Sequence, residues 1–272
     1  MVFGMTFVPR PSYAWKTYRR LVRTHTQFFS APDVLPETDI LKLCNLSAPF
    51  PGVANDSCPT IVIDLHMPEE DLWNAVEPKT RKVIRQATRE GIQIGQPQLS
   101  EETWKSFLAA YWKLWSRKQN AGALGVGQIS ELIETGRFTM TTSRDMNENT
   151  LSWHTYIRSA DRVRLLNTVS AIDPARDTQW NNMVGRAHRL HHWQDMLLFK
   201  RDGIRTYDLG GVYCGTNDTE QLNIARFKKS FGGGPAKTFD AILPLTTMGR
   251  IALSLVGMIG AEARAGGPGG TA

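Results

Sequence analysis

Apolar and polar positions along the chain follow two different periods. In "SEETWKSFLAAYWKLWSRK", residues 100–118, apolar side chains recur every three or four positions, which predicts an amphipathic helix. Ser100 precedes the first turn and is suited to cap it. The stretches "RFTMTTSRD", "NTLSWHTYIRS" and "DRVRLLNTVSA" are instead short, strand-like and separated by polar turns. They predict three consecutive strands that form an antiparallel meander.

Further helices and strands are predicted on both sides of this meander. Upstream, "TIVIDLHM" is typical of a strand, and it is followed by a short helix and by a second helix that begins at Pro78 and ends at Gly91. Downstream, the pattern predicts a long helix over 186–203, a strand, a helix capped by Thr219 and another strand. From Glu101 onward the order is α, β, β, β, α, β, α, β. It predicts an α/β fold, with a mixed sheet and helices on both faces.

This order of elements resembles the GNAT acyltransferase fold. The upstream β-α-α-β segment, residues 60–95, looks like the start of a second, incomplete copy on the N-terminal side. We therefore expect a partial GNAT-like unit over 1–96 and a GNAT-like acyltransferase core over 97–264. The glycine-rich tail over 265–272 is expected to be disordered.

Charge and composition narrow the possible partners. The net charge is +6 at pH 7 and the isoelectric point is about 9.3, which favours an anionic partner such as a phosphate-bearing substrate, a nucleic acid or an anionic membrane surface. A solvated basic surface without a special partner explains the same charge. The three cysteines are widely spaced, which argues against a disulfide framework and a structural zinc site. His188 and His192 lack an HExxH context, so we predict no metal site.

Two observations bear on the compartment. The first 20 residues lack the layout of a secretory signal, and the most apolar stretch, which starts at Ile251, is too short to span a bilayer. We expect a cytoplasmic protein.

Three stretches resemble the FemABX family of aminoacyl transferases. They are "TIVIDLHMPEEDLWNAVEPKTRKVIRQATREGIQI", "LHHWQDMLLFKRDGIRTYDLGG" and "FKKSFGG", and the likeness covers roughly 60–96 and 150–245. The resemblance implies that an aminoacyl group moves from aminoacyl-tRNA to an amine, on a peptidoglycan precursor or a small-molecule biosynthetic intermediate. Acyl transfer from an activated ester depends on positioning and on stabilisation of the oxyanion, so we expect no cofactor.

The resemblance also implies where the donor binds. Phe227 and Lys228 match the Phe-Lys pair of the family motif. Lys228 would hold a phosphate or stabilise the oxyanion, and Phe227 would pack near the terminal adenosine of the donor. In the alternative interpretation Phe227 faces the core and Lys228 is solvated.

The acceptor cleft is expected at the segment Tyr207–Gly211 and on the strand that carries Trp153 and His154. Gly210 and Gly211 permit a close approach of the backbone to a ligand. Asp208 is a candidate proton acceptor or orienting group for the amine, or else it caps the turn. His154 is a candidate base, or else a buried core histidine.

Arg81 and Arg85 recur on one face of the helix that begins at Pro78. They are candidates for contacts to phosphates of the tRNA or of a nucleotide. A solvated helix face is the simpler interpretation of the same pattern.

Two other functions remain open. An acyl-CoA-dependent GNAT enzyme would cradle the pyrophosphate in a glycine loop at a helix N-terminus, and "NNMVGRA", with Asn182, Gly185 and Ala187, is a degenerate match to such a loop. A basic, tryptophan-rich GNAT-like domain is also compatible with an RNA-binding module that has no catalytic activity.

Overall fold

The computed structural model describes residues 22–116, 129 and 132–255. The chain forms two compact units: one combines 1–57 with 238–272, and the other is 58–237. In the described ranges no helix is both long and apolar enough to cross a membrane. The glycine-rich tail lies outside these ranges.

A mixed sheet is the centre of the second unit, with strands in the order β3, β8, β7, β6, β5, β4. Their bounds are β3 (Asn55–Asp64), β4 (Gln93–Gly95), β5 (Phe138–Arg144), β6 (Thr150–Arg158), β7 (Arg162–Ser170) and β8 (Thr206–Gly211). Neighbours pair antiparallel except β7 and β8, which are parallel. Because parallel neighbours need a crossover, the chain passes through α6 (Thr178–Arg201) between them. The predicted meander is confirmed as β5, β6 and β7.

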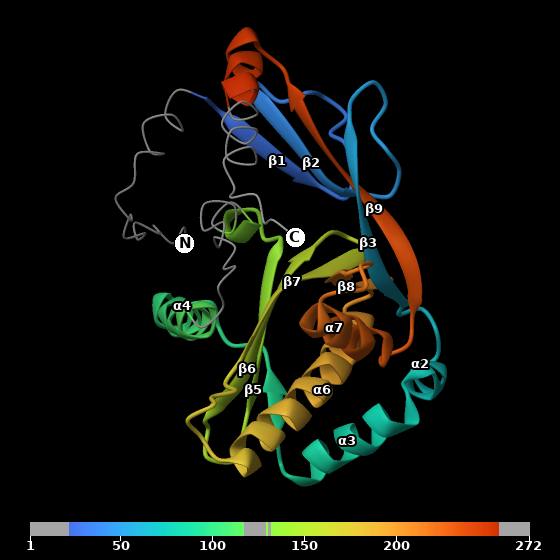
Figure 1. Cartoon of the computed structure of the whole chain (residues 1–272), viewed down its shortest axis with the longest axis vertical. Coiled ribbons are helices and arrows are strands. Elements are labelled where there is room, and N and C mark those ends of the chain that lie inside the picture. The colour runs from blue at the N-terminus through green and yellow to red at the C-terminus, as the bar shows by residue number, and fades with distance from the viewer. Residues whose placement is uncertain (1–21, 117–128, 130–131, 256–272) are drawn as a thin grey trace, which may run out of the picture. The chain divides into compact units, whose positions relative to one another are not determined.

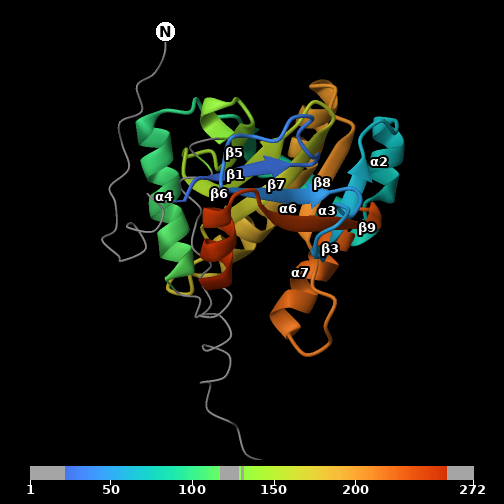
Figure 2. The same cartoon turned by 90° about the horizontal axis from the view of Figure 1, so that it is seen from above.

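Helices cover both faces of this sheet (Figure 1). Other helices of this unit are α2 (Glu69–Ala75), α3 (Pro78–Arg89), α4 (Glu101–Trp115) and α7 (Thr219–Lys229). α3 and α6 pack against each other on one face, and α4 covers the other, as the two views agree (Figure 1, Figure 2). The predicted mixed α/β architecture with helices on both faces is therefore confirmed.

Side chains of β6 that point to opposite faces of the sheet contribute to both cores of this unit. Tyr156 packs into the larger core, which α3 and α6 cover. Trp153 points the other way and packs with Phe107 and Tyr111 of α4. Successive side chains of a strand point to opposite faces, so one strand serves two cores.

The helix caps confirm one prediction and correct another. The hydroxyl of Ser100 accepts a hydrogen bond from the backbone N–H of Thr103 at 3.2 Å, so Ser100 caps α4 as predicted. The predicted cap of α7 at Thr219 is wrong. The carboxylate of Asp218 accepts from the backbone N–H of Gln221 at 3.0 Å, and Thr219 is the first helical residue. A carboxylate one residue earlier satisfies the same N–H group and also favours the positive end of the helix dipole.

The boundary expected between residues 96 and 97 falls inside the second unit. β4 precedes that point and β5 follows it, and the two strands pair through Gln93–Gly95 and Thr142–Arg144. α3 likewise packs against α6, which comes far later in the sequence. These long-range contacts join the upstream β-α-α-β segment to the rest of the unit.

The first unit is smaller and has its own core. β1 (Thr24–Phe28) pairs parallel with β2 (Ile40–Leu46), and β2 pairs antiparallel with β9 (Gly234–Pro244). The core contains Leu41, Leu43, Leu46, Ala241 and Leu243.

Candidate functional site

Strand β8 places two polar side chains on opposite faces of the sheet of the second unit. Tyr207 faces α6, and Asp208 faces away from it, and both are fully buried. Two polar regions surround these side chains. We call the first the charged cluster (Thr60, Arg162, Arg164 and Asp208) and the second the histidine network (Thr141, Ser152, His154, Tyr156, His188, His191, His192, Asp195 and Tyr207).

The charged cluster is organised by the carboxylate of Asp208. Arg162 and Arg164, both on β7, donate to one carboxylate oxygen, and the Arg164 bond measures 2.7 Å. Thr60 and the backbone N–H of Gly210 donate to the other oxygen, the latter at 2.8 Å. The parallel register of β7 and β8 brings Arg164 directly beside Asp208.

These four donors determine what Asp208 can do. Burial alone raises the pKa of its carboxyl group, but Arg164, Thr60 and Arg162 outweigh burial and lower the pKa below its ordinary value. A carboxylate that is ionised and already accepts four hydrogen bonds is a poor proton acceptor. Asp208 also accepts from the N–H of Gly210, but both residues lie within β8, so the alternative of a turn cap is not found either. The geometry thus favours a role in holding two arginines rather than in proton transfer.

Lys228 reaches the end of β8 from α7. Its ammonium group donates to the carbonyl oxygen of Gly211 at 2.6 Å. Burial, followed by the charge of Arg164, lowers the pKa of Lys228 to about 8, while Asp208 partly opposes this shift. Gly210 has φ of +78°, and a Cβ atom there would lie 3.2 Å from the carbonyl oxygen of Leu165 and 3.8 Å from the ammonium nitrogen. The backbone thus passes close to the cation at a point where any other residue would be strained.

Phe227 is half-buried and links α7 to the histidine network. Its ring stacks on that of His188, with centroids 4.9 Å apart and an interplanar angle of 18°, and it meets Phe231 edge-on at 5.2 Å. The guanidinium of Arg189 lies 5.2 Å from its ring centroid. Part of the ring therefore packs against the core, as the alternative interpretation expected.

The histidine network is centred on Asp195 of α6. One carboxylate oxygen, Oδ2, accepts from the hydroxyl of Tyr156 at 2.5 Å and from that of Thr141 at 3.2 Å. The same oxygen lies 2.8 Å from Nδ1 of His154. The hydroxyl of Tyr156 lies 2.9 Å from that of Tyr207, so β6 and β8 are connected across the core through their tyrosines.

Burial keeps the bases of this network neutral. It is the main reason why the pKa of His154, His191 and His192 lies well below the ordinary value and why that of His188 falls to about 4. Burial also raises the pKa of Asp195. His154, predicted as a candidate base, is fully buried in this network, which corresponds to the alternative of a core histidine.

The structure does not bring all predicted residues together. The prediction that Trp153 lines a cleft together with His154 is wrong. Trp153 lies on the opposite face of β6 and packs on α4. Arg81 donates to the carbonyl oxygens of Trp73 and Asn74 at the end of α2. Arg85 lies 5.2 Å from the ring centroid of Trp73. Both arginines are thus placed against α2 and not in the charged cluster.

The alternative of a pyrophosphate-binding glycine loop at "NNMVGRA" is also wrong. Asn182, Gly185 and Ala187 lie inside α6, which begins at Thr178 and is capped by the carboxylate of Asp177. Their backbone N–H groups serve the helix, and an acidic cap repels a phosphate at its N-terminus. This segment is therefore not a pyrophosphate loop.

Sequence reasoning missed the partners of the predicted residues. Arg162 and Arg164 are spaced by two on a predicted strand, which places them on one face, but no pattern named Asp208 as their partner. His191 and Asp195 are four apart on a predicted helix, which likewise places them together. Both spacings were visible, whereas the pairing between elements was not.

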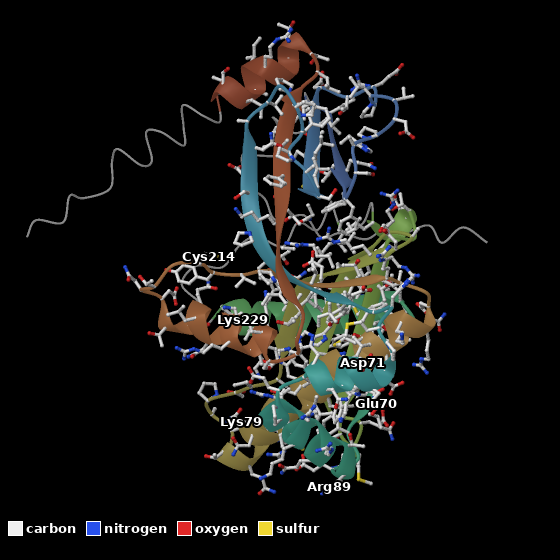
Figure 3. The ribbon with its side chains drawn as sticks, turned by 90° about the vertical axis from the view of Figure 1, so that its right-hand side faces the viewer. Glu70, Asp71, Lys79, Arg89, Cys214 and Lys229 are labelled. Atoms are coloured by element: carbon white, nitrogen blue, oxygen red, sulfur yellow. The ribbon has the colours of Figure 1, made fainter. Side chains whose placement is uncertain are left out.

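An open hollow of about 440 Å³ lies beside α2. Glu69, Glu70, Trp73 and Trp193 line it, and the indoles of Trp73 and Trp193 are 4.8 Å apart. In Figure 3, Glu70 projects from α2 while Lys79 and Arg89 mark the two ends of α3. Acidic and aromatic side chains suit a cation, and Arg85 already supplies one over Trp73.

Comparison with known proteins identifies the fold. No family model and no curated protein matches the sequence. Among solved structures, FemX matches with a TM-score of 0.56 and 13% identity over 73% of this chain and 63% of that chain. The C-terminal domain of a putative lysylphosphatidylglycerol synthetase from Agrobacterium fabrum has a TM-score of 0.47 at 11% identity, covering 79% and 71% of the two chains. A GCN5-related N-acetyltransferase from Kribbella flavida has 0.35 at 11%, covering 76% and 43%.

The fold is therefore GNAT-like, as predicted, and the FemX match fits the FemABX resemblance at the level of the fold. The chain spans less than two thirds of the length of FemX.

Proposed function

We propose that this protein is an amide-forming acyltransferase that moves an aminoacyl group from aminoacyl-tRNA to an amine acceptor. The acceptor would be a peptidoglycan precursor or a small-molecule biosynthetic intermediate. The fold shared with FemX and the three stretches that resemble the FemABX family support this proposal. One observation carries it: the ammonium group of Lys228, in the Phe-Lys pair, lies at Gly210 and Gly211, the last two residues of β8.

The chemistry needs a cation at such a place. The free amine attacks the ester carbonyl of the donor, a C–N bond forms and the C–O bond to the ribose breaks. The proton that the amine loses ends on the leaving ribose hydroxyl. Negative charge gathers on the carbonyl oxygen in between, and a fixed N–H donor stabilises it. With a pKa of about 8, Lys228 is mostly protonated at neutral pH and so can act as that donor or hold a phosphate.

The surrounding charges favour an anionic donor. Arg162, Arg164 and Lys228 bring three cations together near the carboxylate of Asp208. The half-buried ring of Phe227 lies one residue before Lys228 and offers an aromatic surface for a base. A phosphate-bearing nucleotide end combines both features.

Donor binding tests the proposal directly. We would titrate the purified protein with bulk aminoacylated tRNA, with uncharged tRNA and with acetyl-CoA, each at two salt concentrations. Lys228→Met should weaken binding of aminoacylated tRNA at least tenfold. The matched control is Lys229→Met, which removes the same charge from the exposed neighbour on α7 (Figure 3) and should leave binding within about twofold.

Each other outcome has a clear meaning. Equal losses in the two lysine variants would reduce the effect to general electrostatics and contradict the proposed donor site. Binding of acetyl-CoA without binding of tRNA would favour an acyl-CoA-dependent GNAT enzyme. Equal affinity for charged and uncharged tRNA, with no transfer to any amine, would favour an RNA-binding module.

A further inference from the structure

We propose that His154, His188 and His192 form a binding site for a divalent transition-metal ion, with Zn²⁺ as the best-fitting ion. His154 comes from β6, and the other two are one turn apart on α6. One ring nitrogen of each lies within 4.8 Å of those of the other two. The inference goes beyond the proposed acyl transfer and does not depend on it.

The hydrogen bonds of His154 occupy Nδ1 and leave Nε2 for a ligand. Nδ1 lies 2.8 Å from the carboxylate of Asp195, an acceptor, and so carries the proton. Nε2 is then a bare lone pair. It is buried and meets no hydrogen-bond partner among the residues that the structure describes. A buried acceptor in this state is costly unless something binds it.

A chain of hydrogen bonds determines in the same way which ring nitrogen of His192 carries the proton. The hydroxyl of Tyr156 donates to Asp195, so its oxygen accepts from the hydroxyl of Tyr207 at 2.9 Å. The oxygen of Tyr207 in turn accepts from Nδ1 of His192, also at 2.9 Å. Nδ1 of His192 therefore carries its proton, and Nε2 is the lone pair.

His188 is the third ligand of the proposed metal site. Its Nε2 is also buried without a hydrogen-bond partner in the described part of the chain. The ring centroids of His154, His188 and His192 lie 4.3 to 5.0 Å apart. Because His188 as a whole is only half-buried and stacks on Phe227, it marks the side from which an ion would enter.

The neighbouring set of His154, His191 and Asp195 is less suitable. The hydroxyl of Thr141 donates to Asp195 and accepts from Nε2 of His191 at 2.8 Å, while Nδ1 of His191 accepts from Ser152 at 2.7 Å. Both nitrogens of His191 are therefore occupied. Its ring also stacks flat on that of His154 at 3.6 Å, so the two cannot converge on one ion.

The proposed set has the properties of a zinc site. Burial holds the imidazoles neutral, which is the state that binds metal. Asp195 and Tyr207 accept hydrogen bonds from Nδ1 of His154 and His192 and so fix their tautomers, as carboxylates and other acceptors do for histidines that bind zinc. Three nitrogens at about 2.1 Å from one zinc ion lie roughly 3.4 Å apart. The nitrogens of this set lie within 4.8 Å of one another, so they need to approach by up to about 1.4 Å. Three ligands leave a fourth position open.

We predicted no metal site because the sequence lacks an HExxH motif. Such a motif reveals only ligands that lie close together in the sequence. His188 and His192 have the i, i+4 spacing of two ligands on one helix face. The third ligand, His154, lies on a strand far away in the sequence. Only the packing of α6 against β6 brings it to the pair.

Metal binding by the wild-type protein is the first test. Protein treated with a chelator and dialysed would be titrated with Co²⁺, and the visible absorption of four-coordinate cobalt would be recorded. We expect saturation at one ion per chain, loss of the bands on addition of Zn²⁺, and a higher Tm with Zn²⁺ than without it. No saturable binding of either ion to the folded protein would overturn the proposal.

Variants then locate the site. His188→Gln and His192→Gln should each weaken Co²⁺ binding at least a hundredfold, and Asp195→Asn about 10–100-fold through the orientation of His154. His191→Gln, on the same helix but outside the set, and His66→Gln, at an exposed position, should retain the bands. Circular dichroism would select the variants that remain folded.

Loss of the bands in folded His191→Gln or His66→Gln, with retention in His188→Gln, would place the metal elsewhere and overturn the assignment. Binding of aminoacylated tRNA would be measured separately in chelator, so failure of either proposal is recognised without the other.

Discussion

Tyr207 and Asp208 are consecutive residues of one strand, yet they belong to two regions in which buried polar groups are stabilised in different ways. On the Tyr207 side, the four histidines of the histidine network are kept neutral by burial and are joined to their neighbours by hydrogen bonds. On the Asp208 side, the charged cluster is ionised and its charges are paired. Burial opposes a charge on both sides, and the outcome differs because Arg164, Thr60 and Arg162 stabilise the ionised form of Asp208.

The difference also indicates opposite ligands. The charged cluster and Lys228 carry more positive than negative charge and so favour an anion. The histidine network holds bare nitrogen lone pairs and so favours a cation. Both adjoin α7, where Phe227 stacks on His188 and Lys228 reaches Gly211. Three measurements would break or sharpen this comparison.

Acid should produce the largest effect, mainly through the histidines of the histidine network. The pKa of His188 is about 4 in the folded protein and 6.5 when unfolded, so between these values the unfolded chain binds more protons. Stability is then complete above about pH 6.5 and falls as the pH drops toward 4. His188 alone accounts for about 3 kcal/mol of this loss, and His154, His191 and His192 add to it. Denaturant unfolding at a series of pH values measures the slope.

The matching variant is His188→Gln, which should reduce the slope of stability against pH by close to one proton. Asp208 adds nothing in this window, because its pKa lies below the ordinary value of 3.8. A flat stability profile from pH 6.5 to 4.5 would contradict the description of a neutral, buried network.

Removal of the central charge of the charged cluster should come next. Asp208→Asn removes the carboxylate that pairs with Arg162 and Arg164, whose side chains are only 14% and 12% exposed. We expect a loss of about 3–5 kcal/mol in the free energy of unfolding. Glu101→Gln removes one partner of the exposed pair with Lys105 and should change stability by no more than about 1 kcal/mol. Similar values for the two variants would mean that the charged cluster is solvated.

A single hydroxyl of the histidine network should matter least. Tyr207→Phe preserves the ring but leaves Nδ1 of His192 without its acceptor and Tyr156 without a donor. The expected cost is about 1–3 kcal/mol by urea unfolding. Tyr213→Phe, which lies in the segment before α7, is the control and should be close to neutral. Equal stability of the two variants would show that water replaces the missing hydroxyl and that the network is open to solvent.

Local patterns predicted most of the elements and only part of the site. The meander and the helices followed from periodicity because burial of one face requires it. The cap of α7 was misplaced by one residue, since Asp218 and Thr219 are both good caps and only the backbone geometry separates them. Trp153 and His154 were assigned to one cleft although neighbours on a strand point to opposite faces. Lys228 was found by resemblance, and its place at the end of β8 came only with the structure.

The sequence by itself determined the set of elements, their order, and which residues share a face. These depend on the local period of apolar and polar residues in each helix or strand. Tertiary structure alone decided which faces meet. It placed Arg162 and Arg164 against Asp208 through the parallel register of β7 and β8, and His154 against His188 and His192 through the packing of α6 on β6. Whether a buried group is charged or neutral depends on such neighbours, which come from distant parts of the chain. The chemistry of Tyr207 and Asp208 was therefore beyond any local pattern.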